Sequence, residues 1–349
     1  MAMTEILTRD PVEVVLSDFF AERTRRATPL AEHYALLWRR LARSSEGGKR
    51  LRPRLLLDAH RAFGAPHPED AAIAAAAFEL VHTALLLHDD VLDKDLTRRG
   101  RPNLAAEFAT DAIRGGLPAG AATAWGTASG ILGGDLLLSS AYALVSRVRS
   151  AGRAELTDII DEALFRAAAG EHDDVAFGLG TAPATPERLL RMMANKTGSY
   201  SFAGPLRAGG ALAGAGEEAS ADLERVGIAL GMLYQVRDDL LGVFGDPVRT
   251  GKSTTGDLRE GKRTLLVACA EGDPAWTEVR HLWGKPDLSE DEAELLRTAL
   301  VASGARSSVA DLVEAKRRAA IATIERTTLP VALRQELIGL AGMLAERES

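Results

Sequence analysis

The chain has 349 residues and a formal net charge of −7, from 42 Lys and Arg residues against 49 Asp and Glu residues. This acidic balance argues against a general nucleic-acid binder, whose surface would be basic. A chain of this length can bury a large core without disulfides or structural metals. Its single cysteine, Cys269, excludes a disulfide within the chain and fits a reducing compartment.

The spacing of apolar residues predicts helices along almost the whole chain, because strict two-residue alternation is hard to find. Clusters of glycine and proline, such as Gly47-Gly48, separate the helical stretches, and Gly204–Glu218 is expected to be a helix end followed by a loop. With no compelling repeat and no long linker, we predict one all-α domain over residues 1–349. In chain order the predicted helices are Val12–Thr24, Leu30–Ala42, Arg52–Phe63, Pro68–Leu92, Thr123–Ser150, Leu156–Phe177, Pro186–Ala203, Ala219–Val243, Arg263–Ala270, Ser289–Ser303, Ser308–Thr327 and Pro330–Arg347.

Two observations bear on membrane segments. The most apolar stretch, Ala71–Leu87, is interrupted by Glu79 and His82 and is shorter than a bilayer span. The N-terminal residues include charged side chains among the apolar ones, which is not typical of a signal peptide. We therefore expect a cytoplasmic protein without a transmembrane segment.

The strongest local signal is Asp89-Asp90-Val91-Leu92-Asp93, at the end of an apolar predicted helix. On a helix Asp89 and Asp93 lie one turn apart on the same face, where two carboxylates repel each other. A cation that both can reach removes this penalty, and Mg²⁺ suits a site with few carboxylates and remaining positions for water or phosphate oxygens. The alternative is a solvated acidic helix end. The apolar run up to Leu87 favours the mouth of a cavity.

A second acidic pair, Asp238-Asp239, follows the apolar stretch Val226–Leu233 about 150 residues later. Two such pairs, each ending an apolar helix, suggest helices that face one another across a cavity with metal between them. The second motif has no carboxylate one turn further on, because position 242 is glycine. Asp246 lies two turns from Asp238, although the intervening glycines could break the helix first.

Basic residues accompany both acidic motifs. Gly47-Gly48-Lys49-Arg50 stands just before a predicted helix, where backbone amides and the helix N-terminus favour an anion. Further cations are found at Arg98-Arg99-Gly100-Arg101, Lys196, Lys252 and Gly261-Lys262-Arg263. Each alone would be an ordinary solvated charge. Together with the carboxylates and the apolar helices they predict a ligand with a diphosphate head and a hydrocarbon tail.

The order of these motifs resembles that of the trans-prenyl diphosphate synthases, the polyprenyl synthetase family, from about Gly47 to Thr264. The segment from Asp238 to Asp246, followed by Thr250-Gly251-Lys252, is especially similar to bacterial geranylgeranyl diphosphate synthases. The resemblance implies an isoprenoid synthase fold, which is a helical bundle around a deep apolar cavity. It also implies a homodimer with Mg²⁺ as cofactor that condenses isopentenyl diphosphate with an allylic diphosphate.

The resemblance also implies roles for single residues. The diphosphate of isopentenyl diphosphate is expected to bind Lys49, Arg52, His82 and Arg99. The allylic diphosphate is expected to bind Arg98, Lys196, Thr197, Gln235, Lys252 and Lys262. The expected Mg²⁺ ligands are Asp89, Asp93 and Asp238, and the expected catalytic residues are Asp89, Asp93, Asp238, Lys196 and Arg98.

Two positions depart from the family pattern. The usual Gly-Gln-x-x-Asp reads Gly170-Glu171-His172-Asp173-Asp174, and glycine stands at 242 in place of the last aspartate of the second motif.

Product length is expected to depend on the side chains below the first motif: Ala84, Leu85, Val81 and, deeper, Phe78. Small Ala84 leaves room for a chain longer than fifteen carbons, so we hypothesise a twenty-carbon product.

Two other functions remain open. A terpene cyclase would share the fold, the magnesium and the first motif, but it would not need Lys49, Arg52 and His82. A non-catalytic regulatory subunit of a prenyl synthase commonly loses aspartates from one motif, whereas both leading pairs are present here.

Overall fold

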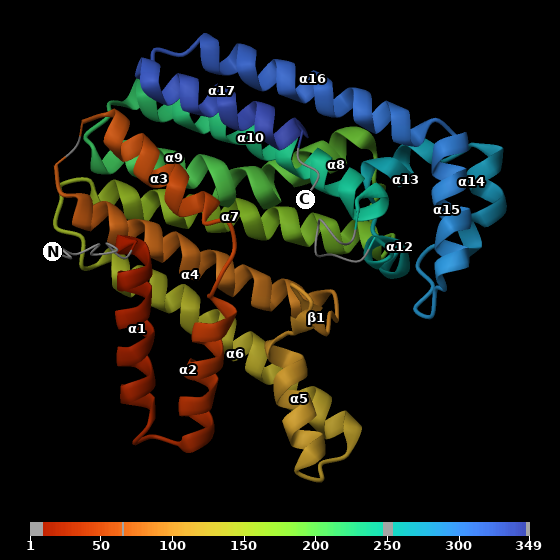
Figure 1. The fold of residues 1–349 in the computed structure, drawn as a ribbon, viewed down its shortest axis with the longest axis horizontal. Coiled ribbons are helices and arrows are strands. Elements are labelled where there is room, and N and C mark those ends of the chain that lie inside the picture. Colours follow the sequence, from red (N-terminus) through yellow and green to blue (C-terminus); the bar gives the residue numbers. More distant parts are fainter. Residues whose placement is uncertain (1–9, 65, 247–253, 347–349) are drawn as a thin grey trace, which may run out of the picture. The chain divides into compact units, whose positions relative to one another are not determined.

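The computed structural model describes residues 10–64, 66–246 and 254–346, which are helical apart from one short hairpin (Figure 1). The predicted all-α class is therefore confirmed. The chain divides into two compact units, which are taken separately below. The first unit comprises Met1–Ile159 and Ala208–Ala215, and the second comprises Ile160–Arg207 and Gly216–Ser349. The single domain over residues 1–349 stays a prediction.

The first unit is built around α4 and α6, which pack along each other. Glycines on α6 allow this close approach: a Cβ at Gly130 would lie 2.7 Å from Cγ2 of Val91, and one at Gly134 would meet the His88 ring. The elements of this unit are α1 (Pro11–Ala27), α2 (Glu32–Ser44), α3 (Leu51–Ala62), α4 (Pro68–Leu92), β1 (Thr97–Arg98), β2 (Arg101–Pro102), α5 (Leu104–Arg114) and α6 (Ala119–Val145). Two further helices, α7 (Arg153–Gly178) and α9 (Gly204–Leu212), have residues in both units.

The second unit is built around α10, which packs on a π-helix, η1. It also packs on α16 and α17, as Figure 1 shows. Glycines again permit the contact, because a Cβ at Gly227 or Gly231 would lie less than 3.0 Å from the backbone of η1. The remaining elements are α8 (Pro186–Met193), η1 (Ala194–Ala203), α10 (Glu217–Phe244), α12 (Gly256–Glu260), α13 (Leu265–Ala270), α14 (Pro274–Val279), the 3₁₀-helix η2 (Arg280–Leu282), α15 (Glu290–Ala302), α16 (Ala305–Glu325) and α17 (Val331–Glu346).

By length and composition α4 and α6 could each cross a membrane, with mean hydropathy of 1.6 and 1.4 over their most apolar windows. A buried core helix meets the same criteria. The window in α4 is 72% buried inside the structure, with Phe78 and Leu80 fully enclosed. The two helices are thus weak evidence for a membrane span, and the absence of one stays a prediction.

The structure differs from the predicted elements in several places. The stretch Pro186–Ala203 is not one α-helix, because its second half is the π-helix η1. The segment expected to be a helix end and loop contains α9. The hairpin β1–β2 was not predicted, since two-residue strands are too short to show any periodicity. The helices α5, α12 and α14 and the 3₁₀-helix η2 were not predicted either.

Candidate active site

The first acidic motif lies at the C-terminal end of α4, as its sequence predicts. Asp89 and Asp90 are in the last turn, and Asp93 is the C-cap residue, its backbone N–H donating to the Asp89 carbonyl over 2.8 Å. The C-terminus of a helix carries partial negative charge, so carboxylates gathered there are unfavourable without a nearby cation. The hairpin that follows supplies one.

The hairpin β1–β2 aims two consecutive arginines in different directions. Its turn residues, Arg99 and Gly100, have φ of 53° and 71°, as a tight two-residue hairpin turn requires. Arg98 donates to Asp90 over 2.7 Å and to Asp89 over 3.1 Å. Arg99 donates instead to the carbonyl of Glu46 over 2.9 Å. The turn therefore links the first acidic motif to the glycine loop before α3.

Asp90, which sequence reasoning did not assign a role, is the most buried carboxylate of this cluster. Burial raises the pKa of Asp90 to about 6, against the opposing effect of Arg98. The neighbouring carboxylates Asp89 and Asp95 raise this pKa further. The three acids in turn raise the pKa of Arg98, although burial acts against this. Arg98 thus offsets the repulsion between the carboxylates at the end of α4.

The loop 47–50 lies against Arg99. Gly47 and Gly48 have φ of 76° and 83°, in the left-handed region that favours glycine. A Cβ at Gly48 would lie 3.1 Å from Nη2 of Arg99, so the loop passes close to the guanidinium. Arg50 fixes the end of the loop through ion pairs of 2.6 Å to Glu13 on α1 and 2.6 Å to Glu79 on α4. This anchoring role of Arg50 was not predicted.

His82 faces a concentration of positive charge. Burial lowers the pKa of His82 well below its usual range, and the charges of Arg52, Arg99, Arg98 and Arg50 lower it further. Two of the residues predicted to bind isopentenyl diphosphate, Arg52 and Arg99, thus lie close enough to a third, His82, for their charges to lower its pKa. Of these three, Arg99 lines a cavity of about 640 Å³, whose lining also includes Gly47, Gly48 and Arg98. Lys49 is exposed on the same loop.

In the second unit, a chain of side-chain hydrogen bonds joins η1 to the second acidic motif. The hydroxyl of Thr197 donates to Oε1 of Gln235 over 2.8 Å. The amide of Gln235 donates to Oδ1 of Asp239 over 2.8 Å. Burial raises the pKa of Asp239 well above its ordinary range, and the charges of Asp257, Asp238 and Asp174 raise it further, while Gln235 opposes the shift. Asp238 is the less buried member of the pair.

Two predicted lysines of this unit are held by carboxylates. The Lys196 ammonium lies 2.7 Å from Asp174 and 2.8 Å from Glu171, both on α7. Lys262 pairs with Glu260 over 3.0 Å. Lys252 lies outside the described residues. Among residues that sequence reasoning left without a role, Asp174 could have been found from the Gly-x-x-x-Asp pattern.

The comparisons with known proteins agree with this geometry. A family model described as polyprenyl synthetase matches residues 39–299. Geranylgeranyl diphosphate synthase from Mycobacterium tuberculosis is 34% identical over 330 residues, covering 90% of this chain and 85% of that protein. Geranylfarnesyl diphosphate synthase from Aeropyrum pernix is 36% identical over 265 residues, covering 74% of this chain and 77% of that protein.

The chain belongs to the polyprenyl synthetase family.

Among solved structures, geranylgeranyl pyrophosphate synthase from Corynebacterium glutamicum, complexed with isoprenyl diphosphate and magnesium, superimposes with a TM-score of 0.89. It shares 27% identity and covers 97% of this chain and 98% of that one. The expected isoprenoid synthase fold is therefore confirmed. The two relatives named above are synthases of products that differ in length, so similarity alone leaves the product of this family member open.

The predicted chain-length residues lie on α4 below the first motif. Ala84 and Val81 are fully buried, as is Phe78, while Leu85 is partly exposed. Their buried side chains are small or apolar, as a hydrocarbon tail would require. The depth of the predicted cavity stays a prediction.

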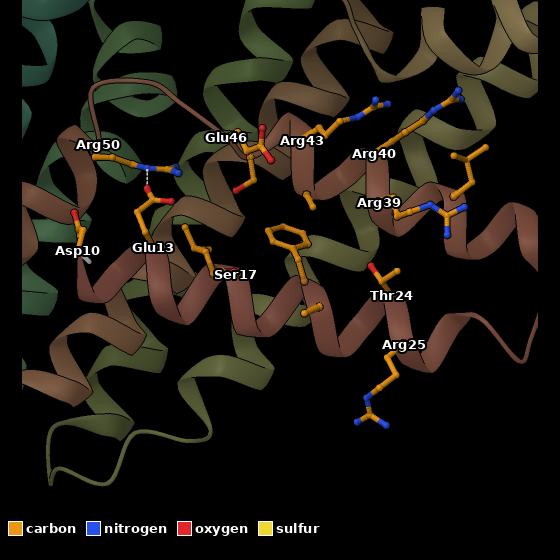
Figure 2. Close-up of a pocket in the computed structure, with 16 residues that line it drawn as sticks. Asp10, Glu13, Ser17, Thr24, Arg25, Arg39, Arg40, Arg43, Glu46 and Arg50 are labelled. Atoms are coloured by element: carbon orange, nitrogen blue, oxygen red, sulfur yellow. Dashed lines mark hydrogen bonds and ion pairs between the residues drawn. The ribbon is translucent and has the colours of Figure 1, made fainter. Parts of the chain in front are cut away.

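A larger cavity of the first unit, of about 1180 Å³, is lined by residues of α1, α2 and the loop before α3 and shares Arg43 and Glu46 with the smaller one. Figure 2 shows several arginines around it, including Arg39, Arg40 and Arg43, and the ion pair between Glu13 and Arg50. Arg40 is already paired with Glu107 over 2.9 Å. None of the predicted site residues lines this cavity, so we do not assign the active site to it.

Proposed function

We propose that this family member is a prenyltransferase that condenses isopentenyl diphosphate with an allylic diphosphate, giving geranylgeranyl diphosphate. One observation carries the proposal: the hairpin turn brings Arg98 onto the first aspartate motif and Arg99 onto the glycine loop before α3. Within one unit this arrangement places carboxylates for a metal next to cations for a diphosphate. A terpene cyclase would need the first group but not the second.

The carboxylates fit magnesium as a cofactor. Within residues 10–64, 66–246 and 254–346, no group of three or more His, Cys, Asp or Glu side chains forms a ready-made metal cage. Mg²⁺ rarely uses such cages, because it keeps several waters and completes its shell with phosphate oxygens. The ligands that we propose for Mg²⁺ are Asp89 and Asp93 in the first unit and Asp238 in the second. When bound, it would neutralise the charge that develops on the diphosphate leaving group.

The chain's own residues have separable tasks in this proposal. Lys49, Arg52, His82 and Arg99 bind the diphosphate of isopentenyl diphosphate and orient its double bond. Arg98, Lys196 and Lys262 stabilise the charge that develops on the allylic diphosphate as its carbon–oxygen bond breaks, since fixed cations cost no reorganisation at that moment. The double bond attacks the allylic cation, and the departing diphosphate takes the proton that is then lost.

Product length follows from the floor of the tail cavity. Ala84 lies five residues before Asp89, just over one turn below the motif. A methyl side chain there leaves room for the tail to pass, and bulkier Phe78 deeper in α4 would stop it. This supports a product of twenty carbons.

We also propose that the enzyme acts as a cytoplasmic homodimer. Large apolar side chains remain exposed on α5 and α6, among them Ile113, Trp125, Ile131 and Leu132. Neighbouring exposed apolar residues mark interaction surfaces. The single cysteine supports a reducing compartment.

Product analysis tests the proposed activity. The protein is incubated with Mg²⁺ and isopentenyl diphosphate, with dimethylallyl, geranyl or farnesyl diphosphate offered separately. We expect a defined elongated diphosphate that is lost with a chelator and in Asp89→Ala. A hydrocarbon product without elongation would instead indicate a cyclase, and folded protein without any product would indicate a regulatory subunit.

A further inference from the structure

The ammonium group of Lys196 lies between two carboxylates of one helix. Its Nζ is 2.8 Å from Oε2 of Glu171 and 2.7 Å from Oδ2 of Asp174. Residues 171 and 174 of α7 are three positions apart and therefore share a face. All three side chains are about one quarter exposed, with 24%, 25% and 23% of their surface accessible. A ligand from solvent can therefore reach the same ammonium.

The backbone keeps Lys196 at this position. A Cβ at Gly170 would lie less than 3.0 Å from the backbone nitrogen of Lys196, so η1 and α7 are in close contact there. Position 196 lies near the start of the π-helix, and π-helical turns are found frequently at functional sites. Lys196 thus starts within reach of both carboxylates, and only its side chain can turn towards another anion.

Charge counting shows what Glu171 adds. The formal charges of one lysine and two carboxylates add up to −1, whereas with a glutamine at 171 they would add up to zero. The family pattern has a glutamine at this position, which has nearly the same shape and can still accept a hydrogen bond. An incoming diphosphate therefore meets a lysine that is already neutralised by two acids. It must separate at least one ion pair before Lys196 can bind it fully.

We propose that Glu171 competes with the allylic diphosphate for Lys196 and so sets the affinity of this enzyme for its primer. The inference rests on the proposed function, because it takes Lys196 as a ligand of the allylic diphosphate. Glu171 is a positioning residue, because it affects primer binding through Lys196. Its charge weakens primer binding while Asp174 alone still orients the ammonium.

The test compares Glu171→Gln with Glu162→Gln, which removes the same charge from an exposed position on the same helix. Calorimetry measures the Kd for inorganic diphosphate at fixed Mg²⁺, and steady-state kinetics give KM and kcat for each allylic primer. We expect Glu171→Gln to lower both the Kd and the primer KM about fivefold, as loss of a partly exposed ion pair implies. The kcat should change much less, and Glu162→Gln should match the wild type.

Lys196→Met, made in both the wild-type and Glu171→Gln backgrounds, isolates the competition. If Glu171 acts through Lys196, replacing Glu171 should have no effect on the Kd once Lys196 is absent. A gain in affinity that persists in Lys196→Met would mean direct repulsion of the diphosphate and would overturn the proposal. An unchanged or weaker affinity in Glu171→Gln, with the thermal unfolding midpoint preserved, would overturn it as well.

The two hypotheses fail in different ways. If the wild type elongates no primer, the proposed function is wrong, and the Kd for inorganic diphosphate still decides the competition at Lys196. If the wild type elongates primers but Glu171→Gln leaves the Kd unchanged, both with Lys196 and in Lys196→Met, the proposed function stands and the role of Glu171 is wrong.

Discussion

The carboxylate of Asp257 occupies the space that a side chain at position 242 would need. A Cβ built on Gly242 of α10 would lie less than 3.0 Å from Oδ2 of Asp257, which comes from α12. The second acidic motif lacks its last carboxylate in sequence, yet a carboxylate stands beside that position in the fold. Glycine at 242 is therefore matched to Asp257 and is more than a missing ligand.

Gly242→Ala should destabilise the protein, because the new methyl group displaces the Asp257 side chain. Overpacking of this kind costs about 1–3 kcal/mol, with a value near the lower end here because the Asp257 side chain can turn aside and because alanine is favoured over glycine within a helix. Gly339→Ala on α17 is the matched control, since a Cβ at Gly339 meets nothing within 4 Å. An alanine there should be neutral or stabilise the helix by about 0.5–1 kcal/mol. Urea unfolding of both variants measures the difference.

Removal of Asp257 checks the cause of that loss. In an Asp257→Ala background, Gly242→Ala should lower the free energy of unfolding much less than it does in the wild type. The difference is the coupling energy of the double-mutant cycle. Additive effects of the two substitutions would contradict the contact between them.

Gly170→Ala should be more damaging, because the atom in its way belongs to the backbone. The added Cβ would meet the nitrogen and Cα of Lys196, which cannot turn aside as a side chain can. We expect a loss of about 3 kcal/mol and weaker binding of inorganic diphosphate, since Lys196 is pushed out of register. Gly178→Ala at the end of the same helix has open space around its Cβ and serves as the control. Equal thermal unfolding midpoints for the two variants would contradict the close contact of η1 with α7.

Apolar periodicity and the spacing of Asp89 and Asp93 are local properties. The sequence was therefore sufficient to predict most of the helices, though not α5, α12 or α14, and it predicted the first motif. It did not predict the hairpin, whose strands are too short, although this hairpin is what separates the tasks of Arg98 and Arg99. It also did not predict the role of Asp257. No local pattern links residues 242 and 257, and only the packing of α12 on α10 brings them together.

His82 predicts a pH dependence of stability. Its folded-state pKa lies well below the ordinary 6.5 because of burial and the nearby arginines, so the unfolded chain binds the proton more readily. The free energy of unfolding should therefore fall as pH drops below about 6.5, by at most about 1.4 kcal/mol per pH unit. Asp90 acts in the opposite sense between about pH 4 and 6, because its pKa is raised in the folded state.

A comparison with His82→Gln separates the two effects. Urea unfolding from pH 5 to 8 should show a steeper acid loss for the wild type than for His82→Gln, while the contribution of Asp90 is common to both. Parallel curves would mean that His82 is not held neutral by its surroundings.

Ala84→Phe should shorten the product by one isoprene unit, from twenty to fifteen carbons in our proposal. Ala84 is fully buried on α4 between the first motif and Phe78, and a benzyl group there would block the path of the growing tail. Because overpacking a closed site can cost about 1–3 kcal/mol, the thermal unfolding midpoint is measured first and the assay is run well below it. Ala84→Ser, which adds only a hydroxyl, should keep the wild-type product. Chromatography of the dephosphorylated alcohols, with dimethylallyl diphosphate as primer, gives the chain length directly. An unchanged length in folded Ala84→Phe would place the tail elsewhere than beside this residue.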